Sequence, residues 1–221
     1  MDENIKELIN KTVMKIIDNT SSHEKIRNLE NKHGIKVHFI PKRYRILGGI
    51  LQSMNIQFGN FIERLMALFI ENDGRYELMP NYNGKKNNPF KISSENESLI
   101  DSYISRCEET KYIDINVEFQ NLLKKIVADK NESTKEVKHD IDLLFKDKST
   151  KKIYYLECKY NDDHDTGKFT DINRKFIKTY SYLVKELNIA DSAKLVPILF
   201  FFTNKKMKDN IYIPEKSNIY R

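Results

Sequence analysis

The sequence predicts an α/β protein that combines amphipathic helices with a small set of strands. Several segments carry apolar residues at the three- and four-residue spacing of a helix that buries one face. Two short segments rich in β-branched, aromatic and aliphatic residues enclose a polar run, which is the pattern of a β-hairpin. The apolar run Leu195 to Phe202 adds a buried strand, with Pro197 near its start, where a missing N–H is tolerated.

The N-terminal residues predict two helices. Apolar residues from Ile5 to Ile17 recur at helical spacing, which indicates an amphipathic helix. Ser21 or Ser22 can cap a second helix, which the pair His33-Gly34 would end.

Residues 43–72 predict one interrupted helix and one longer helix, after a short extended stretch from Lys36 to Ile40. The break between the two helices is expected near Gly59. The longer helix, Phe58 to Asn72, carries an apolar stripe on one face, with Glu63 beside that stripe.

A strand, a loop and two further helices are expected next. Arg75 to Met79 is a short strand candidate, and the polar segment Asn81 to Asn88, which contains an Asn-Gly pair, predicts a loop. Ser94 and Glu97 form a capping box at the start of one helix, and Val117 to Asp129 predicts another.

The hairpin is predicted to pair Ile141 to Phe145 with Ile153 to Lys159, because Lys146 to Lys152 holds turn formers and no apolar residue. In the register that places Asp142 opposite Glu157, the turn falls in the middle of this polar run. Directly opposed residues have Cβ atoms only about 5 Å apart. Two carboxylates at that distance repel each other and titrate as a pair unless a cation lies between them.

Two acids and a lysine in this hairpin form the pattern of a metal site. Glu157 and Lys159 share one face of their strand, and hard carboxylate oxygens favour Mg²⁺ or Mn²⁺. Asp140 lies on the same face as Asp142 by the two-residue period, and Asp142 is favoured because it abuts the apolar run. The competing interpretation is a surface hairpin with a cross-strand charge pair. The apolar residues beside both acids argue against it, because a buried acid is costly without a ligand or partner.

This hairpin resembles the core of the PD-(D/E)XK nuclease superfamily, with Asp142 as the first acid and Glu157-Cys158-Lys159 as the ExK element. The segment Asn161 to Phe176 is similar to Type II restriction endonucleases, and hints at enzymes that cut short sites with an unspecified central base, such as GANTC. Ile141 stands where the proline of the family name would be. The resemblance implies a restriction-endonuclease-like core, in which helices flank a central mixed sheet, over about Phe58 to Phe202.

The resemblance also implies roles for individual residues. Asp142, Glu157 and the carbonyl of Cys158 would hold Mg²⁺, with Mn²⁺ as a substitute. Lys159 would orient the attacking water or stabilise the transition state. Glu63 would assist a second metal or its water shell; the alternative is a solvated helix residue that pairs with a lysine.

A basic helix is predicted after the hairpin, from Ile172 to Leu187, with Asp171 as its cap. Basic side chains near its N-terminal half would bind backbone phosphates, and an asparagine or arginine there would reach a base edge. A solvated lysine face is the alternative. The candidate DNA-binding residues are Lys168, Asn173, Arg174, Lys175 and Lys178.

Composition limits the classes of protein that fit. A net charge of +6 suits a polyanionic substrate, although it also fits a basic protein of another kind. The 2 cysteines provide neither a disulfide framework nor a zinc-binding pair. The sequence has no long apolar span and no signal segment, so a cytoplasmic protein without membrane contact is expected.

The resemblance, with which charge and composition agree, implies a Type II restriction endonuclease that cuts both strands of double-stranded DNA at a short palindromic site and leaves a 5′-phosphate. A palindromic site predicts a homodimer, and a cognate DNA methyltransferase is expected as a genetic partner. The alternatives are a junction resolvase or repair nuclease, and a catalytically silent DNA-binding protein on the same fold. The expected organisation is an N-terminal helical region (1–57) packed on a nuclease core (58–221) that carries an insertion at about 80–136, in one domain overall.

Overall fold

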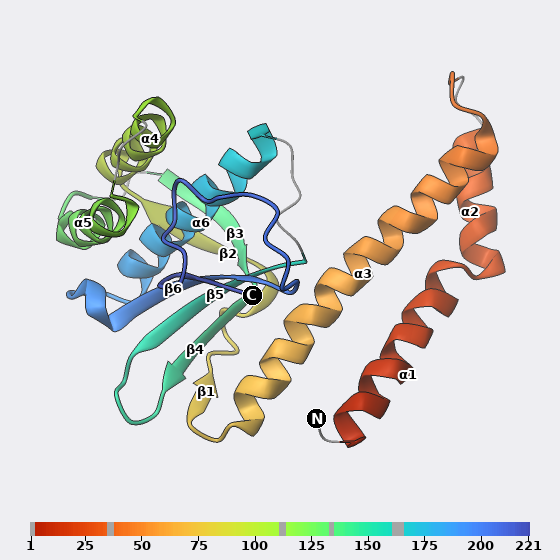
Figure 1. The fold of residues 1–221 in the computed structure, drawn as a ribbon, viewed down its shortest axis with the longest axis horizontal. Helices are drawn as coiled ribbons and strands as arrows, with labels where there is room; N and C mark the ends of the chain where they lie inside the picture. The colour runs from red at the N-terminus through yellow and green to blue at the C-terminus, as the bar shows by residue number, and fades with distance from the viewer. Residues whose placement is uncertain (1–2, 35–37, 111–113, 133–134, 161–165) are drawn as a thin grey trace. The chain divides into compact units, whose positions relative to one another are not determined.

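The structure, a computed structural model, describes residues 3–34, 38–110, 114–132, 135–160 and 166–221 (Figure 1). The chain divides into two compact units, Met1–Leu65 and Met66–Arg221. The first unit is helical, and the second contains a mixed sheet flanked by helices, so the predicted α/β fold is confirmed. Among the described residues, no helix is both long enough and apolar enough to cross a membrane.

The predicted pair of N-terminal helices is present in the first unit. They are α1 (Glu3–Thr20) and α2 (His23–Gly34). The backbone N–H of Lys25 donates to Ser22 Oγ at 3.3 Å, so Ser22 provides the cap of the second helix.

The third helix, α3 (Lys42–Asn72), begins in the first unit and ends in the second. It runs through Gly59 without interruption, so the predicted break is wrong. A glycine inside a helix costs only about 1 kcal/mol relative to alanine, and a helix of 31 residues tolerates that loss. The predicted extended stretch from Lys36 to Ile40 lies partly outside the described residues.

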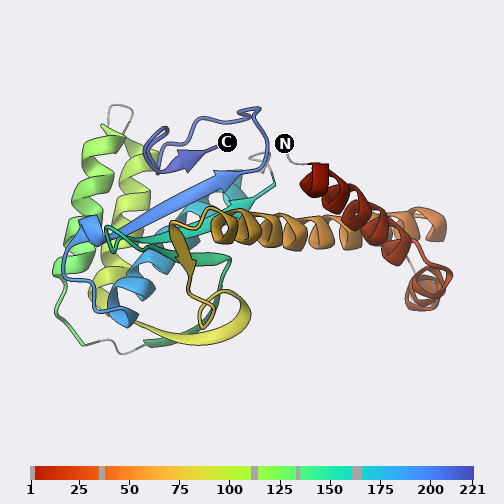
Figure 2. The ribbon, with the colours of Figure 1, turned by 90° about the horizontal axis from the view of Figure 1, so that it is seen from below.

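Five strands form the main sheet of the second unit (Figure 2). They are β1 (Tyr76–Leu78), β4 (Leu143–Asp147), β5 (Ile153–Lys159), β6 (Leu195–Phe201) and β7 (Ile219–Tyr220). Their order across the sheet is β1-β4-β5-β6-β7. The first three strands are antiparallel neighbours, whereas β6 runs parallel to β5 and β7 parallel to β6. The strand with the ExK element is therefore central, which explains its apolar composition.

The hairpin between β4 and β5 has the predicted register. Leu143 pairs with Leu156, which places Asp142 opposite Glu157. Asp142 itself lies at a bend between β4 and the preceding strand, β3 (Lys135–Ile141). The first predicted strand of the hairpin is thus divided at the acid into two strands that belong to different sheets.

The second sheet pairs β3 with β2 (Gly84–Ile92). The predicted loop from Asn81 to Asn88 is therefore wrong from Gly84 onward. The register of this pair shifts between Gly84 and Asn88, and φ is 82° at Gly84 and 49° at Asn87. Such a bulge needs no alternating apolar pattern, so the polar sequence gave no signal of a strand.

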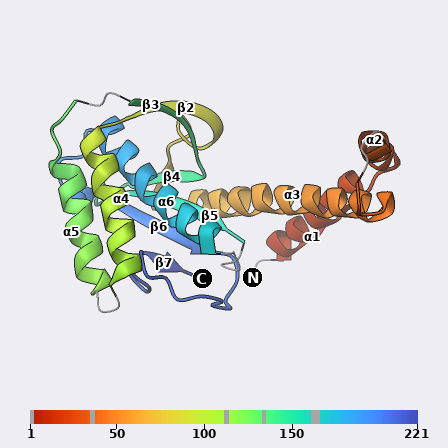
Figure 3. The same cartoon turned by 90° about the horizontal axis from the view of Figure 1, so that it is seen from above.

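Helix α6 (Thr166–Glu186) lies between the two sheets (Figure 3). Its Phe176 stacks on Tyr155 of β5, with ring centroids 5.4 Å apart. Its Tyr182 stacks on Phe90 of β2, with centroids 5.9 Å apart. Aromatic contacts on two sides of α6 therefore hold both sheets to one helix.

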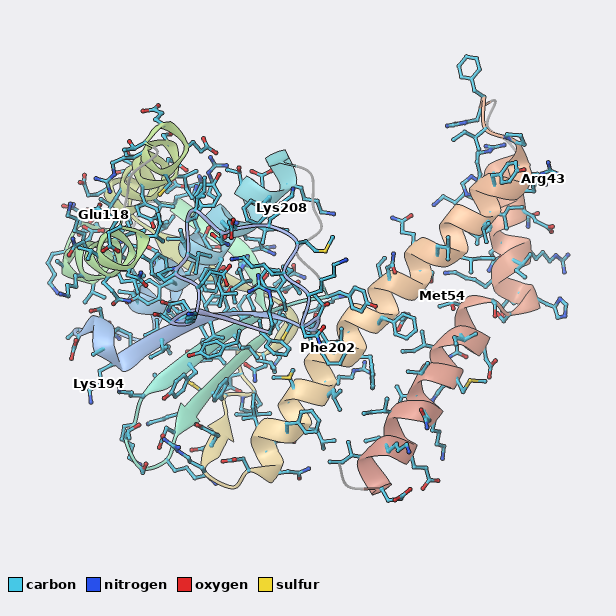
Figure 4. All side chains as sticks on the ribbon, viewed as in Figure 1. Arg43, Met54, Glu118, Lys194, Phe202 and Lys208 are labelled. Carbon is cyan, nitrogen blue, oxygen red and sulfur yellow. The ribbon has the colours of Figure 1, made fainter. Side chains whose placement is uncertain are left out.

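Helices α4 (Ser94–Glu109) and α5 (Ile115–Ala128) pack beside α6 and contribute to the same core as β5 and β6. An ion pair between Arg106 Nη2 and Glu118 Oε2, 2.7 Å long, joins the two helices. Glu118 is labelled in Figure 4. Because their apolar faces are buried in the main core, α4 and α5 help to hold the sheet that contains the hairpin.

The cap of α4 is one residue earlier than the sequence predicts. Ser93 Oγ accepts a hydrogen bond from the backbone N–H of Asn96 at 3.1 Å, so Ser93 is the cap and Ser94 is the first helical residue. Ser93 also donates to Asp129, which follows the end of α5. The true cap is fixed by this contact between helices, which is not visible in the local sequence.

Candidate active site

The two predicted acids and the lysine lie together at the end of the β4–β5 hairpin. Lys159 Nζ is 2.7 Å from Glu157 Oε1 and 4.0 Å from Asp142 Oδ2. The same ammonium donates to the Cys158 carbonyl at 3.2 Å. The backbone N–H of Cys158 donates to Asp142 Oδ2 at 2.8 Å, which holds this acid against β5. We refer to Asp142, Glu157, Cys158 and Lys159 as the hairpin cluster.

Neighbouring charges keep Glu157 and Lys159 ionised. Burial raises the pKa of Glu157, whose side chain is only 4% exposed, but the adjacent Lys159 ammonium reverses this effect and leaves the pKa below its usual value. Burial lowers the pKa of Lys159, but the carboxylates of Glu157 and Asp142 outweigh it and leave the pKa above its usual value. At neutral pH, Glu157 is therefore a carboxylate and Lys159 an ammonium.

The donor atoms of the hairpin cluster suit a hard divalent cation. The three groups predicted to hold a metal all surround the positive charge of Lys159 at 4.0 Å or less. Carboxylate and carbonyl oxygens arranged around one positive charge are the ligands that Mg²⁺ prefers. Within the described part of the chain, no three His, Cys, Asp or Glu side chains form a metal-binding group. A metal ion here would therefore be held by two carboxylates, a backbone oxygen and water.

Asp140, the alternative first acid, takes part in a different contact. Its Oδ1 accepts a hydrogen bond from the backbone N–H of Asn87 at 2.7 Å, in the irregular part of β2. The structure thus places Asp142 in the hairpin cluster, and places Asp140 where it joins β3 to β2.

Comparison with known proteins identifies the family. The sequence model described as Type II restriction endonuclease, HinfI, matches residues 1–221. The chain belongs to this family. It is 53% identical over 221 residues to the Type II restriction enzyme HinfI of Haemophilus influenzae, which is 100% of this chain and 83% of that enzyme. No solved structure matches the chain. The predicted identity as a Type II restriction endonuclease, a site-specific deoxyribonuclease, is confirmed.

The sequence of this HinfI-family chain did not reveal a group of buried polar side chains behind Glu157. The Tyr155 hydroxyl donates to Glu157 Oε2 at 2.6 Å. Thr179 Oγ1 of α6 lies 2.7 Å from His139 Nε2 of β3. Burial raises the pKa of Tyr155 well above its usual value, and Glu157 raises it further, so the hydroxyl remains protonated. The two-residue spacing of Tyr155 and Glu157 places both on one strand face, and this was the available signal.

Two of the predicted DNA-binding lysines of α6 are exposed, Lys168 and Lys175. Burial and then the charge of Lys175 lower the pKa of His139, and the same charge lowers the pKa of Glu157. Lys175 therefore adds positive potential at the hairpin cluster.

Two further basic residues of α6, Arg174 and Lys178, pair with carboxylates of the same chain. Arg174 contacts Asp101 at 3.1 Å and Asp171 at 3.0 Å. Lys178 contacts Glu97 at 3.5 Å and Asp101 at 3.8 Å. Asp171 lies inside α6, which begins at Thr166, so its predicted role as the cap is wrong.

Asn173, the last predicted DNA contact, is fully buried. Its Nδ2 donates to the Phe169 carbonyl at 2.8 Å, and its Oδ1 accepts from Asn210 Nδ2 at 2.8 Å. In this conformation the amide stabilises the start of α6 and the segment that contains Asn210.

Glu63 is half-buried on α3, within the unit Met1–Leu65. Its assistance to a metal stays a prediction. The segment Asn161 to Phe176, which is similar to Type II restriction endonucleases, lies partly outside the described residues, because residues 161–165 are not among them.

Proposed function

We propose that this chain is a Mg²⁺-dependent endonuclease that hydrolyses both strands of duplex DNA within a short palindromic site. The observation that supports this proposal is the hairpin cluster, in which a buried carboxylate, a second carboxylate and a backbone carbonyl lie within 4.0 Å of one ammonium. Paired oxygen ligands beside a fixed positive charge are the groups that phosphodiester hydrolysis requires.

Asp142, Glu157 and the Cys158 carbonyl would hold the metal ion. A bound Mg²⁺ supplies polarisation of the scissile phosphate and a lower pKa for the attacking water. Lys159 orients this water and stabilises the negative charge that develops on the phosphate oxygens, because Glu157 holds its ammonium at 2.7 Å. Water attacks phosphorus in line and loses a proton to solvent, while the bond to the 3′ oxygen breaks and that oxygen takes a proton from solvent. The products carry a 5′-phosphate and a 3′-hydroxyl.

Lys168 and Lys175 are the basic residues that we propose to contact backbone phosphates. Both are exposed, and the charge of Lys175 acts on Glu157. Arg174 and Lys178 would contribute less than Lys175, since each is already paired with carboxylates.

The substrate would be a short site with an unspecified central base, of which GANTC is an example. A two-fold DNA site is read most simply by a two-fold protein, so we propose a homodimer. A DNA methyltransferase would protect the same site as a genetic partner, and Mn²⁺ would replace Mg²⁺ in the reaction.

Digestion of an unmethylated plasmid of known sequence tests this function. With Mg²⁺ we expect discrete fragments that end at GANTC or at one related site, and with EDTA we expect none. Cutting of four-way junctions without fixed plasmid fragments would instead indicate a resolvase. Binding of DNA without cleavage would indicate a catalytically silent protein.

A matched pair of variants tests the assignment of the first acid. Asp142→Asn should abolish cleavage, because it removes a metal ligand. Asp140→Asn should retain most cleavage, since the carboxylate of Asp140 bonds to Asn87. The reverse result would show that Asp140 is the acid.

A further inference from the structure

A chain of buried polar groups lies behind Glu157 and connects three elements. Tyr155 and Glu157 come from β5, Thr179 from α6 and His139 from β3. All four residues are buried, with exposures of 9% or less. Polar side chains are costly to bury unless they satisfy one another, so a connected set of this kind needs an explanation.

The Tyr155 hydroxyl distinguishes the two oxygens of Glu157. It donates to Oε2 at 2.6 Å, whereas Oε1 accepts from Lys159 at 2.7 Å. The tyrosine ring cannot turn away easily, because it is fully buried and stacks on Phe176 with centroids 5.4 Å apart. The carboxylate is thereby held in one rotamer, with Oε1 directed toward the positive charge.

Thr179 braces this arrangement from α6. Its hydroxyl lowers the pKa of Tyr155, and its Oγ1 lies 2.7 Å from His139 Nε2. Thr179 Oγ1 also donates to the Lys175 carbonyl at 2.9 Å, which fixes the side chain against its own helix. His139 precedes Asp142 by three residues, so the same set of contacts reaches the chain segment of the other acid.

We propose that Tyr155 is a positioning residue, which holds Glu157 so that one oxygen faces the cation, and that Thr179 supports Tyr155 in this role. This inference rests on the proposed function, because it assumes that Glu157 is a metal ligand. Hydrogen-bond partners of metal-binding carboxylates typically change metal affinity by 10- to 100-fold when removed. Loss of the Tyr155 hydroxyl should therefore weaken metal binding by about 10-fold.

The test compares Tyr155→Phe with Tyr180→Phe. Tyr180 is also fully buried, and its hydroxyl has no hydrogen-bond partner in the described part of the chain, so the control removes the same atom without removing a contact. The probe is Mn²⁺, and its dissociation constant is measured on the full chain without DNA. The EPR signal of the free ion, which is lost on binding, gives the free concentration. The Mg²⁺ concentration for half-maximal cleavage is the second readout. We expect the Mn²⁺ dissociation constant and the Mg²⁺ concentration for half-maximal cleavage to rise about 10-fold in Tyr155→Phe and to stay at the wild-type values in Tyr180→Phe.

Two further variants keep the outcome decisive. Thr179→Ser retains a hydroxyl and should bind Mn²⁺ like the wild type, whereas Thr179→Val should bind it more weakly. This pair also decides the matter if Tyr155→Phe fails to fold, which its melting temperature will reveal. Wild-type Mn²⁺ affinity in Tyr155→Phe would overturn the inference; if that variant does not fold, wild-type affinity in Thr179→Val would overturn it.

Glu157→Gln separates this failure from a failure of the proposed function. Loss of Mn²⁺ binding in Glu157→Gln, together with normal binding in Tyr155→Phe, would overturn only the positioning role. Normal Mn²⁺ binding and cleavage in Glu157→Gln would overturn the proposed metal site itself.

Discussion

Replacement of Lys159 by methionine should destabilise the metal-free protein and make its stability depend on Mg²⁺. The side chain of Glu157 is 4% exposed, and the variant removes its partner at 2.7 Å. Removal of one member of a buried ion pair costs about 3 to 5 kcal/mol. The remaining hydrogen bond from Tyr155 favours the lower end, about 3 kcal/mol. For a chain of this size, each kcal/mol corresponds to about 2–4 °C, so the melting temperature should fall by roughly 6–12 °C.

Mg²⁺ should restore much of this loss, because it would place a positive charge among the same oxygens. A ligand at 100 times its dissociation constant adds about 2.7 kcal/mol. Thermal unfolding followed by circular dichroism, in EDTA and in Mg²⁺, measures both effects. Lys152→Met is the control, because it removes an exposed lysine that does not act on Glu157. An unchanged melting temperature for Lys159→Met in EDTA would refute the view that Lys159 neutralises the two acids.

Three further predictions follow from the geometry. Ser93→Ala should lower the free energy of unfolding, measured in urea, by about 1 kcal/mol, because it removes the cap of α4. Ser94→Ala should lower it little, and equal losses in the two variants would place the cap elsewhere. Burial and the charge of Lys175 hold the pKa of His139 below 6.5, so the unfolded chain binds more protons than the folded one below that value. His139 therefore contributes stability that is present above about pH 6.5 and is lost as the pH falls through the folded pKa. Urea unfolding between pH 5 and 8 should show a weaker pH dependence in His139→Gln, and an identical slope would contradict this. Lys175→Ala should weaken DNA binding and reduce the slope of log affinity against log salt concentration by about 1. Arg174→Ala should change this slope less, and the opposite order would contradict the proposed contacts.

The hairpin was predictable because its signals are local. The polar run from Lys146 to Lys152 fixes the turn, and a two-residue period then places Asp142 opposite Glu157, as the structure shows. Strand β2 was missed for a local reason as well, since its bulge between Gly84 and Asn88 removes any alternating pattern.

Other features depend on contacts between residues far apart in the sequence. Ser93 is the cap of α4 partly because it meets Asp129, and a local pattern could not distinguish it from Ser94. The contact of Thr179 with His139 joins residues 40 positions apart, and only the packing of α6 between the two sheets brings them together. The sequence thus indicates the residues of the hairpin cluster, whereas the groups that support Glu157 require the folded structure.

The most direct test of the hairpin cluster is single-turnover cleavage by Lys159→Ala, with DNA binding measured in parallel in Ca²⁺. Loss of the ammonium should slow cleavage by about 10²- to 10³-fold or more, because the group acts on charge that develops in the transition state. DNA affinity should remain close to that of the wild type. Near-normal cleavage by this variant would contradict the proposed mechanism.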